Sequence, residues 1–482
     1  MYHDLNLYIA GAWRGASDGA TRPVTDPSTE EALGTIAVAT EGDIDLALEA
    51  AREGFAEWRQ VGPWDRGARL RRAAELIRER TDAIATLMSL ETGKPLAEAK
   101  GETGAAADQF EWYAEETKRI YGQTIEGRTP QSRMAVIYQP VGVVAAFSAW
   151  NFPALLPARK IAAALGAGCS IIVKPAGEAP ASCAALVEAC HDAGIPAGAV
   201  NYLTGNSSMI AERLIRSPIV RKVTVTGSVP VGKEILRLAA EGVKKVSMEL
   251  GGHGPVLVFD DVDAAAVAET CALTKFRNCG QVCISPSRFY VHESKYEAFA
   301  ARFAEVAKSL KLGSGLDEGV QMGPMANRRG VATVEAMVAD ALGRGADLLA
   351  GGGRPASINS GYFFEPTVLG RVPDDAQVMV EEPFGPIAPI ATFTDYDDVI
   401  ARANALPFGL AGYVFSDSMT TATRAYEDLE VGMVGVNEML LATAEAPFGG
   451  VKESGMGREG GSLGIKDYLD PKYVKMKIGT MR

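Results

Sequence analysis

Three side chains of this 482-residue sequence have the types that covalent chemistry on a carbonyl group requires. Cys283 follows a predicted helix, Glu249 ends a predicted strand just before two glycines, and Asn151 ends another strand. A thiolate attacks carbonyl carbon, a carboxylate can activate water, and a side-chain amide beside a backbone N–H can hold an oxyanion. Each residue alone is more often a packing residue or a solvated charge. Their occurrence together in one chain predicts a nucleophilic site.

The elements that must position these residues form two α/β blocks. From Val141 onward, short β-branched runs alternate with helical segments, and successive strands are about 25–30 residues apart, as in a parallel sheet. The first block has predicted strands at 141–147, 170–173, 200–203, 220–226 and 246–250, with helices starting near 154, 181, 209 and 231. A second block opens with a strand at 255–259, has long helices at 263–276 and 294–310, and ends near 464. The strand ends carry polar or Gly/Pro-rich turns, where such sheets bind ligands.

The segments outside these blocks have a different pattern. Apolar residues at three- and four-residue steps predict long amphipathic helices at 43–58 and 65–91, and the stretch 101–121 continues in the same style. The polar stretch 122–138 reads as an extended hairpin, and 471–480 alternates like a terminal strand. The predicted fold class is therefore α/β with parallel sheets and a small β excursion.

Composition excludes several classes of protein. Hydrophobic residues make up 47% and charged residues 22%, which is enough for large cores and leaves no sign of bulk disorder. The net charge of −12 argues against a nucleic-acid or anionic-membrane partner. The sequence shows no secretory signal and no long apolar run, and its six cysteines and four histidines have no ligand-like spacing. We therefore expect a reduced, cytoplasmic protein without a metal site.

Seven stretches, in order, resemble the NAD(P)-dependent aldehyde dehydrogenase superfamily from about residue 5 to the end of the sequence. They are WNFP at 150–153, KPAGEAP at 174–180, TGS at 226–228, ELGG at 249–252, FRNCGQVC at 276–283, EPFGP at 382–386 and PFGGVKESGMGREGG at 447–461. The FRNCGQVC stretch and the last one are most similar to the succinate-semialdehyde and α-ketoglutarate-semialdehyde dehydrogenases. The resemblance implies a Rossmann-like cofactor domain in 1–121 and 141–250, an α/β catalytic domain in 251–467, and an oligomerisation arm and tail in 122–140 and 468–482.

The same resemblance implies a set of catalytic roles. Cys283 would add to the aldehyde to give a thiohemiacetal, whose oxyanion Asn151 and the backbone N–H of Cys283 would hold. After hydride transfer to the nicotinamide, Glu249 would activate the water that releases the carboxylic acid. Lys160 and Glu459 match positions near a proton exit path, and a simple ion pair is an equally good interpretation of them.

The resemblance also implies how a dinucleotide would bind, although the GxGxxG fingerprint is absent here as it is in the family. Gly227, Ser228 and Gly232 would face the pyrophosphate at a helix N-terminus. Lys174 would meet the adenosine ribose and Glu382 the nicotinamide ribose. The remaining expected cofactor contacts are Trp150, Leu250 and Phe384.

The choice between NAD and NADP stays open. In this family a glutamate three residues after the lysine binds the ribose hydroxyls and repels a 2′-phosphate. That position is Gly177 here, which should admit NADP. Because Glu178 is adjacent to it, we expect NAD or NADP.

Two arginines near the predicted nucleophile point to the substrate class. Arg159 lies eight residues after Asn151 and Arg277 six residues before Cys283. Guanidinium groups bind carboxylates in a bidentate manner. In the semialdehyde branch, arginines at the two matching positions clamp the distal carboxylate of the substrate. We therefore expect a short ω-carboxy aldehyde, succinate semialdehyde by preference, with Thr443 as a third contact.

Several alternatives remain at this level. The substrate could be α-ketoglutarate semialdehyde or an uncharged aromatic or aliphatic aldehyde, and an acylating enzyme would pass the acyl group to coenzyme A. Glu249 speaks against the acylating mechanism, since a water-activating base favours hydrolysis. A non-catalytic protein on the same scaffold is the alternative from another class.

Two expectations concern the other cysteines and assembly. Cys279 could form a reversible disulfide but reads better as a buried, inert thiol, and we expect Cys169, Cys183, Cys190 and Cys271 in the core. By analogy with the family, the arm and the tail would pair between subunits and give a homodimer or homotetramer.

Overall fold

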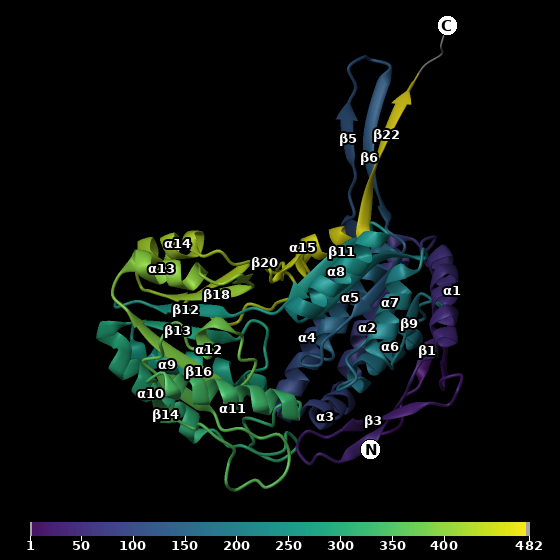
Figure 1. Cartoon of the computed structure of the whole chain (residues 1–482). Coiled ribbons are helices and arrows are strands. Elements are labelled where there is room, and N and C mark those ends of the chain that lie inside the picture. The colour runs from purple at the N-terminus through teal and green to yellow at the C-terminus, as the bar shows by residue number, and fades with distance from the viewer. Residues whose placement is uncertain (1, 479–482) are drawn as a thin grey trace.

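The computed structural model describes residues 2–478, and Figure 1 shows two α/β lobes side by side with a narrow β arm projecting from one of them. The lobe that carries the arm has an eight-stranded sheet with the order β2-β1-β9-β8-β7-β10-β11-β21. Its five central strands, β9 to β11 in this order, run parallel, and helices connect them as parallel crossovers require. The strands are β1 (Leu7–Ile9), β2 (Ala12–Arg14), β7 (Val143–Phe147), β8 (Ser170–Lys174), β9 (Val200–Tyr202), β10 (Val220–Gly227), β11 (Lys245–Leu250) and β21 (Gly455–Met456), with a separate hairpin of β3 (Thr21–Thr25) and β4 (Ala32–Ala37).

Eight helices cover this first sheet. Helix α5 is buried along its whole length, which explains its continuous run of alanine and leucine. The first helix starts at a capping box, in which the Thr40 hydroxyl accepts from the Asp43 backbone N–H and the Asp43 carboxylate accepts from the Thr40 N–H. The helices are α1 (Glu41–Trp58), α2 (Pro63–Glu79), α3 (Thr81–Thr92), α4 (Leu96–Glu116), α5 (Leu155–Ala167), α6 (Ala181–Asp192), α7 (Ser207–Arg216) and α8 (Val229–Glu241).

The segment 65–91, predicted as one helix, is two helices. At Arg80 the backbone leaves the helical region, with φ −100° and ψ 12°. The Thr81 hydroxyl donates to the Arg78 carbonyl at 2.8 Å, a side-chain bond that competes with the helical ladder. The apolar periodicity does not show this break, because α2 and α3 both pack against α4 and α6.

The second lobe has a seven-stranded sheet with the order β14-β15-β16-β13-β12-β18-β19, parallel except at β14. Its strands are β12 (Gly254–Val258), β13 (Pro286–His292), β14 (Asp347–Ala350), β15 (Thr367–Gly370), β16 (Ile387–Phe393), β18 (Ala411–Phe415) and β19 (Met433–Val436). Its helices are α9 (Ala264–Phe276), α10 (Tyr296–Ser309), α11 (Arg328–Gly343), α12 (Gln377–Val380), α13 (Tyr396–Asn404) and α14 (Met419–Asp428).

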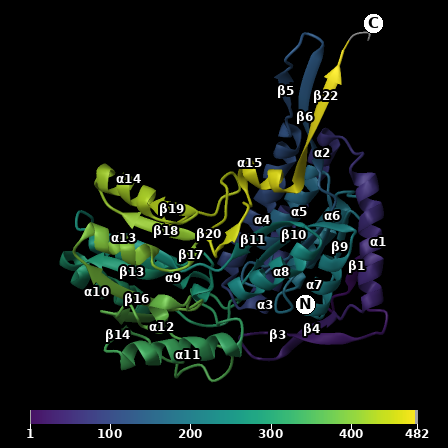
Figure 2. The ribbon, with the colours of Figure 1, turned by 45° about the horizontal axis from the view of Figure 1, so that its top comes forward.

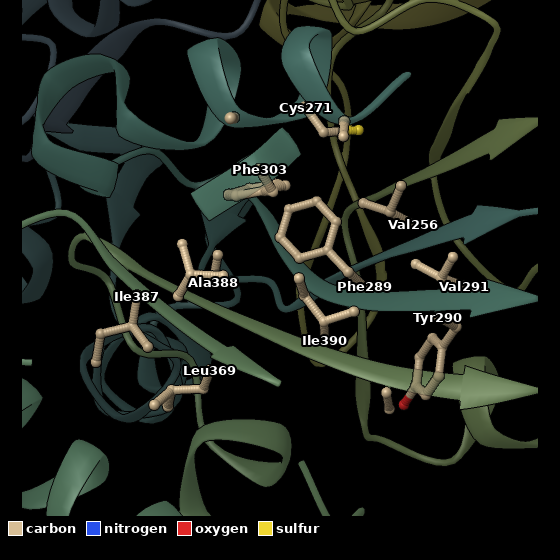
Figure 3. Packing of buried hydrophobic residues seen from close by; sticks show 14 of the residues in the cluster. Val256, Cys271, Phe289, Tyr290, Val291, Phe303, Leu369, Ile387, Ala388 and Ile390 are labelled. Carbon is tan, nitrogen blue, oxygen red and sulfur yellow. The ribbon is translucent and has the colours of Figure 1, made fainter. Parts of the chain in front are cut away.

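Part of the core of the second lobe lies between its sheet and helices α9 and α10, and the same buried cluster includes residues of α11 and α13. Figure 3 shows Phe289 of β13 beside Phe303 of α10, with Cys271 of α9 and Ile390 of β16 in the same cluster. The two phenylalanine rings meet edge-on with centroids 5.0 Å apart, a favoured aromatic geometry. This packing fixes α9, and α9 leads directly into the loop that carries Cys283.

The arm is a three-stranded sheet that extends well beyond the first lobe in Figures 1 and 2. It consists of β5 (Gln123–Glu126), β6 (Ser132–Pro140) and β22 (Leu469–Lys477), with β6 in the middle. Strands β22 and β6 pair antiparallel over nine residues, from Leu469 opposite Pro140 to Lys477 opposite Ser132. The expected hairpin and terminal strand are therefore both present, and the end of the expected tail strand, at 479–480, lies outside the described residues.

The chain returns from the second lobe to the first shortly before the arm. The short strand β20 (Val451–Lys452) still pairs with β17 (Phe408–Gly409) of the second lobe, whereas β21 pairs with β11 of the first. Helix α15 (Gly461–Gly464) then precedes β22. This return brings the 447–461 stretch to the end of β11.

The division into functional units at 250/251 and 467/468 stays a prediction.

The α/β fold class is confirmed, with parallel sheets in both lobes and a small β arm. Among residues 2–478, no helix combines the length and the apolar character that crossing a membrane would require.

Candidate active site

Cys283 lies in a loop that starts where α9 ends, and its side chain is half-buried. The loop turns sharply because Asn278, Cys279 and Gly280 have φ values of 49°, 55° and 70°. A Cβ on Gly280 would lie 2.1 Å from the carbonyl oxygen of Gly385, so only glycine allows this approach. The loop is thereby held against the second lobe at a defined position.

Asn151 follows β7 and is buried next to this loop. Its Nδ2 donates to the Gln281 carbonyl at 3.2 Å, and its own carbonyl accepts from Lys94 Nζ at 2.8 Å and from Asn278 Nδ2 at 3.0 Å. A side-chain amide has two N–H donors, so one remains for another acceptor. The structure thus joins the predicted amide to the loop of the predicted nucleophile.

A buried ion pair that the sequence analysis missed holds Asn151 in place. Lys94 Nζ donates to Glu102 Oε2 at 2.5 Å. The other oxygen of Glu102 accepts from the first N–H groups of α5, those of Ala154 and Leu155, at 2.9 and 3.1 Å. A signal was present in the sequence, because Glu102 lies in the apolar stripe of α4, where an unpaired charge would be costly.

Glu249, at the end of β11, is buried and takes part in a chain of hydrogen bonds. The Thr226 hydroxyl donates to Glu249 Oε2 at 2.8 Å and accepts from Lys160 Nζ at 2.6 Å. Lys160 Nζ also donates to Glu459 Oε1 at 2.5 Å. Lys160 and Glu459 therefore form an ion pair, and Thr226, which the analysis did not single out, connects that pair to Glu249.

The charges around Cys283 and Glu249 shift the pKa of both groups upward. Burial raises the pKa of the Cys283 thiol well above its ordinary range, and the Glu249 carboxylate within hydrogen-bond reach raises it further. Burial also raises the pKa of Glu249, helped by Glu459 and opposed by Lys160 and Arg159. The two groups are thus close enough to exchange a proton.

Arg159, in the second turn of α5, is buried without a carboxylate partner. Its guanidinium carbon lies 3.9 Å from the centroid of the Phe448 ring, and its Nε has no hydrogen-bond partner within residues 2–478. Its charge nevertheless acts on Cys283 and Glu249, whose pKa values it lowers. A buried cation in this position is set up to receive an anion.

Arg277 differs from Arg159 in its surroundings. It is half-buried, with its guanidinium carbon 5.5 Å from the centroid of the Phe152 ring. Its charge lowers the pKa of Glu98, against the larger upward effect of burial on that carboxyl. A nearby carboxylate therefore already offsets part of the charge of Arg277.

Thr443 lies in the loop before the 447–461 stretch, beside helix α5. It lines a cavity of about 420 Å³ together with Gln109, Trp112 and Leu155, and neither Arg159 nor Arg277 lines that cavity. Leu155 is one helical turn before Arg159 on α5, so the cavity borders the same helix. The role of Thr443 as a third substrate contact stays a prediction.

The turn from β10 to α8 fits a pyrophosphate. A Cβ on Gly227 would make only ordinary van der Waals contacts, with Val225 and Val231 at 3.9 Å, and the exposed hydroxyl of Ser228 does not cap its own helix. A Cβ on Gly232 would lie 2.5 Å from the Leu250 side chain, so a glycine there lets α8 pack closely on β11. Backbone N–H groups and a hydroxyl at a helix N-terminus suit a phosphate group.

The expected nicotinamide-ribose residue lies beside the Glu249 strand. Glu382 is half-buried, and its Oε2 lies 2.5 Å from where a Cβ on Gly251 would be. Burial raises the pKa of Glu382 to about 8, while the Gly252 N–H and the buried Lys275 ammonium oppose the rise. The carboxylate is thus placed between the two lobes, where a polar ligand group can replace its lost hydration.

Phe384 and Trp150 pack against each other near Glu382, with ring centroids 5.6 Å apart and nearly perpendicular planes. Phe384 has a φ of 39°, a strained conformation for a bulky residue. The contact connects the loop after α12 to the end of β7, so both expected cofactor contacts lie at the junction of the lobes.

The remaining cysteines are packing residues. Cys169, Cys183, Cys190 and Cys271 are buried, as expected, and so is Cys279. Cys279 is only 1% exposed, so its sulfur is closed to an incoming substrate, whereas Cys283 is half-buried.

Comparison with known proteins identifies the family. A model of the aldehyde dehydrogenase family matches residues 13–474. A glutarate-semialdehyde dehydrogenase of Pseudomonas putida is 45% identical over 471 residues, 98% of this chain and 97% of the relative. A succinate-semialdehyde dehydrogenase of Escherichia coli named for NADP(+) is 44% identical, with 98% of each chain covered. The crystal structure of a succinate-semialdehyde dehydrogenase from Burkholderia pseudomallei superposes with a TM-score of 0.97 at 43% identity, covering 98% of each chain.

These matches cover nearly the whole of this chain and of each relative. Their sequence identities are well above the level at which proteins share only a fold. The motif stretches and the two-lobe architecture agree with them. The chain belongs to the aldehyde dehydrogenase family, and it is an enzyme that oxidises an aldehyde with NAD or NADP.

Proposed function

We propose that this enzyme oxidises a short aldehyde with an anionic group at its far end, succinate semialdehyde by preference, to the dicarboxylate. The observation that carries the proposal is Arg159, a buried guanidinium without a carboxylate partner that acts electrostatically on Cys283. A substrate carboxylate would neutralise this charge and hold the aldehyde carbon at a fixed distance from the sulfur. The names of the glutarate- and succinate-semialdehyde relatives point the same way.

In the proposed mechanism Cys283 is the nucleophile. Its thiol passes a proton to Glu249 as the sulfur bonds to the aldehyde carbon, which suits a thiol of raised pKa beside a carboxylate. The free N–H of Asn151 Nδ2 and the backbone N–H of Cys283 hold the oxyanion of the thiohemiacetal. A bound nicotinamide supplies the acceptor for the hydride that leaves this carbon, and a thioester on Cys283 results.

Hydrolysis of the thioester depends on Glu249. The carboxylate takes a proton from water as the water oxygen bonds to the acyl carbon, and the Cys283 sulfur leaves. The Thr226 hydroxyl, the Lys160 ammonium and the Glu459 carboxylate form a hydrogen-bonded route along which the proton can leave the buried site. Lys160 and Glu459 therefore act at a distance from the substrate.

Lys174, Ser228, Gly232 and Glu382 are proposed as dinucleotide contacts. Lys174 ends β8, Ser228 and Gly232 lie at the start of α8 just after β10, and Glu382 reaches from the second lobe to Gly251, just after β11. The relative from Escherichia coli is named for NADP(+), which favours that nucleotide for this chain as well.

Replacing Arg159 by methionine tests the substrate class. We expect kcat/KM for succinate semialdehyde to fall about 100-fold, or about 2.7 kcal/mol, because the carboxylate loses a buried charged partner. Activity on butanal, which has the same chain length without the carboxylate, should stay within about threefold. The melting temperature should not fall, since removal of an unpaired buried cation costs no folding free energy.

The substrate panel separates the alternatives. Glutarate semialdehyde and α-ketoglutarate semialdehyde test which distance between the aldehyde carbon and the distal carboxylate the site accepts. An aldehyde with a sulfonate at its far end tests whether the site requires a carboxylate or accepts another anion. An Arg277→Met variant should show a smaller effect, because Glu98 already shares the charge of Arg277. An unchanged ratio of succinate semialdehyde to butanal activity in the Arg159→Met variant would refute the proposal.

We also propose that the arm mediates assembly into a homodimer or homotetramer. Strand β22 is an unpaired edge of a three-stranded sheet, and the arm exposes Ile125, Ile137, Tyr473 and Met476, which are 41–57% exposed. Exposed edges and apolar side chains of this kind are usually covered by a partner.

Mass measurement in solution tests the assembly. The full chain should have two or four times the mass of one subunit, and a chain ending at Asp470 should be monomeric, because it lacks the strand that pairs with β6. A full chain that is monomeric at micromolar concentration would show that the arm has another role.

A further inference from the structure

An arginine from the N-terminal hairpin lies at the end of β8. A Cβ built on Gly177 would be 1.7 Å from Nη2 of Arg22 and 2.9 Å from its guanidinium carbon. Arg22 belongs to β3, and its side chain is exposed. The guanidinium therefore occupies the space that a side chain at position 177 would need, so a glycine at 177 and an arginine at 22 are matched.

A second cation lies beside Arg22. Lys174, the last residue of β8, is buried, and its Nζ donates to the Ser207 hydroxyl at 2.5 Å. The pKa of Lys174 is lowered to about 8, mainly by burial; Glu178 opposes this effect and the charge of Arg22 adds to it. Two like charges are thus held near each other, at the first residue of α7, where a helix N-terminus adds positive potential.

Glu178 is the one carboxylate that acts on Lys174, and it is exposed. Arg22 makes no ion pair with a carboxylate anywhere in residues 2–478. The chain carries a net charge of −12, so a pair of cations without a dedicated counter-ion is unusual for this surface. A ligand with two negative charges would satisfy both groups.

The topology indicates which part of a dinucleotide reaches this place. A pyrophosphate at the start of α8 sits at the end of β10, and Cys283 and Glu249 lie toward β11. The nicotinamide half must extend toward them, so the adenosine half extends in the opposite direction, over β7 to β8. With strands about 4.8 Å apart, the ends of β10 and β8 are about 10 Å apart, a distance that an adenosine can span.

We propose that Arg22 adds a second positive charge beside Lys174 and, together with it, binds the 2′-phosphate that distinguishes NADP from NAD, and that Gly177 leaves room for the Arg22 guanidinium. Arg22 is then a specificity-determining residue supplied by a hairpin outside the parallel sheet. The inference depends on the chain being an NAD(P)-dependent enzyme and is independent of the aldehyde it oxidises.

Binding measurements without aldehyde test the subsite. Calorimetry on the wild-type enzyme should show tighter binding of NADP than of NAD, by about tenfold or more, and tighter binding of 2′-AMP than of 5′-AMP. In an Arg22→Gln variant the dissociation constant for NADP should rise about 30-fold, because a charge-assisted contact is lost, while that for NAD stays within about twofold. The preference for 2′-AMP over 5′-AMP should disappear.

Two further variants make the result decisive. Gly177→Glu should weaken the binding of NADP and leave the binding of NAD unchanged, because the new carboxylate would pair with Arg22 and repel a phosphate. Arg128→Gln removes the same charge from the exposed connection between β5 and β6, and Figures 1 and 2 show the arm at the opposite end of the lobe from β3. It should bind both nucleotides like the wild type.

The proposal is overturned if Arg22→Gln binds NADP as tightly as the wild type. It is also overturned if the variant loses affinity for NADP and NAD equally, which would assign Arg22 a structural role. A wild-type enzyme that binds 2′-AMP and 5′-AMP with equal affinity would overturn it as well. None of these results depends on the substrate, so a failure here is distinguishable from a failure of the semialdehyde assignment.

Discussion

A Cys283→Ser variant is expected to lose at least about 10⁴-fold in kcat, while it still binds the dinucleotide. A hydroxyl has a far higher pKa than a thiol, so Glu249 cannot activate it in the way that it activates the sulfur. Steady-state formation of reduced nucleotide at 340 nm measures the loss, and calorimetry with NADP shows that the binding site is intact. The expected loss is large because formation of the thiohemiacetal precedes every later step.

Cys279→Ala is the matched control. This thiol is four residues away in the same loop, but it is only 1% exposed, and the charges that act on its pKa are those of Glu98 and Lys275. We expect kcat within about threefold of the wild type, with some loss of stability from the cavity. Full activity in Cys283→Ser, or a comparable loss in Cys279→Ala, would contradict the assignment of the nucleophile.

The site is assembled from residues that are remote in the sequence. The hydrogen bond between Lys160 and Glu459 joins residues 299 positions apart, and the one between Thr226 and Glu249 joins two neighbouring parallel strands. The return of the chain from β20 to β21 makes the first of these possible, since it carries the 447–461 stretch from the second lobe back to β11. The site therefore depends on the position of the two lobes as much as on either sheet.

The sequence was sufficient to predict the five parallel strands of the first sheet and the turns at their ends. Runs such as 143–147 and 171–173 are buried on both faces, so they are continuous and apolar, and the polar residues that follow them must lie at the edge of a parallel sheet. Asn151 and Glu249 could be placed at strand ends for this reason. The break at Arg80 could not be predicted, because periodicity does not register a one-residue departure from helix.

The partners of charged residues were beyond prediction from the sequence. Arg159 and Arg277 look equivalent in the sequence, but the structure leaves one without a carboxylate partner and places the other near Glu98. No pattern in the sequence singles out Arg22. Its neighbour in space, Gly177, is far away in the chain, and the two meet only because of where the β3–β4 hairpin packs. Tertiary packing decides which charged side chains meet, and a single sequence contains no record of that packing.

A Glu249→Gln variant should separate the two halves of the reaction. The amide cannot accept a proton from water, so we expect kcat to fall about 10³-fold through slow hydrolysis of the thioester. Rapid mixing should still show a burst of reduced nucleotide close to one equivalent per site, because the thioester can form when solvent takes the proton of the thiol. Hydroxylamine, which needs no general base, should restore turnover and give the hydroxamate.

The pH dependence of the wild type supplies an independent check on Glu249. Its pKa is raised above the usual value, so its carboxylate form is lost at a higher pH than for an exposed glutamate. As the pH falls through this raised pKa, protonation removes the base and kcat decreases; Glu249→Gln should lack this acidic limb. Glu98→Gln, which keeps an acceptor for the Asn278 N–H, should retain both the limb and the wild-type rate. A Glu249→Gln enzyme without a burst that hydroxylamine cannot rescue would place the essential role of Glu249 in formation of the thioester instead.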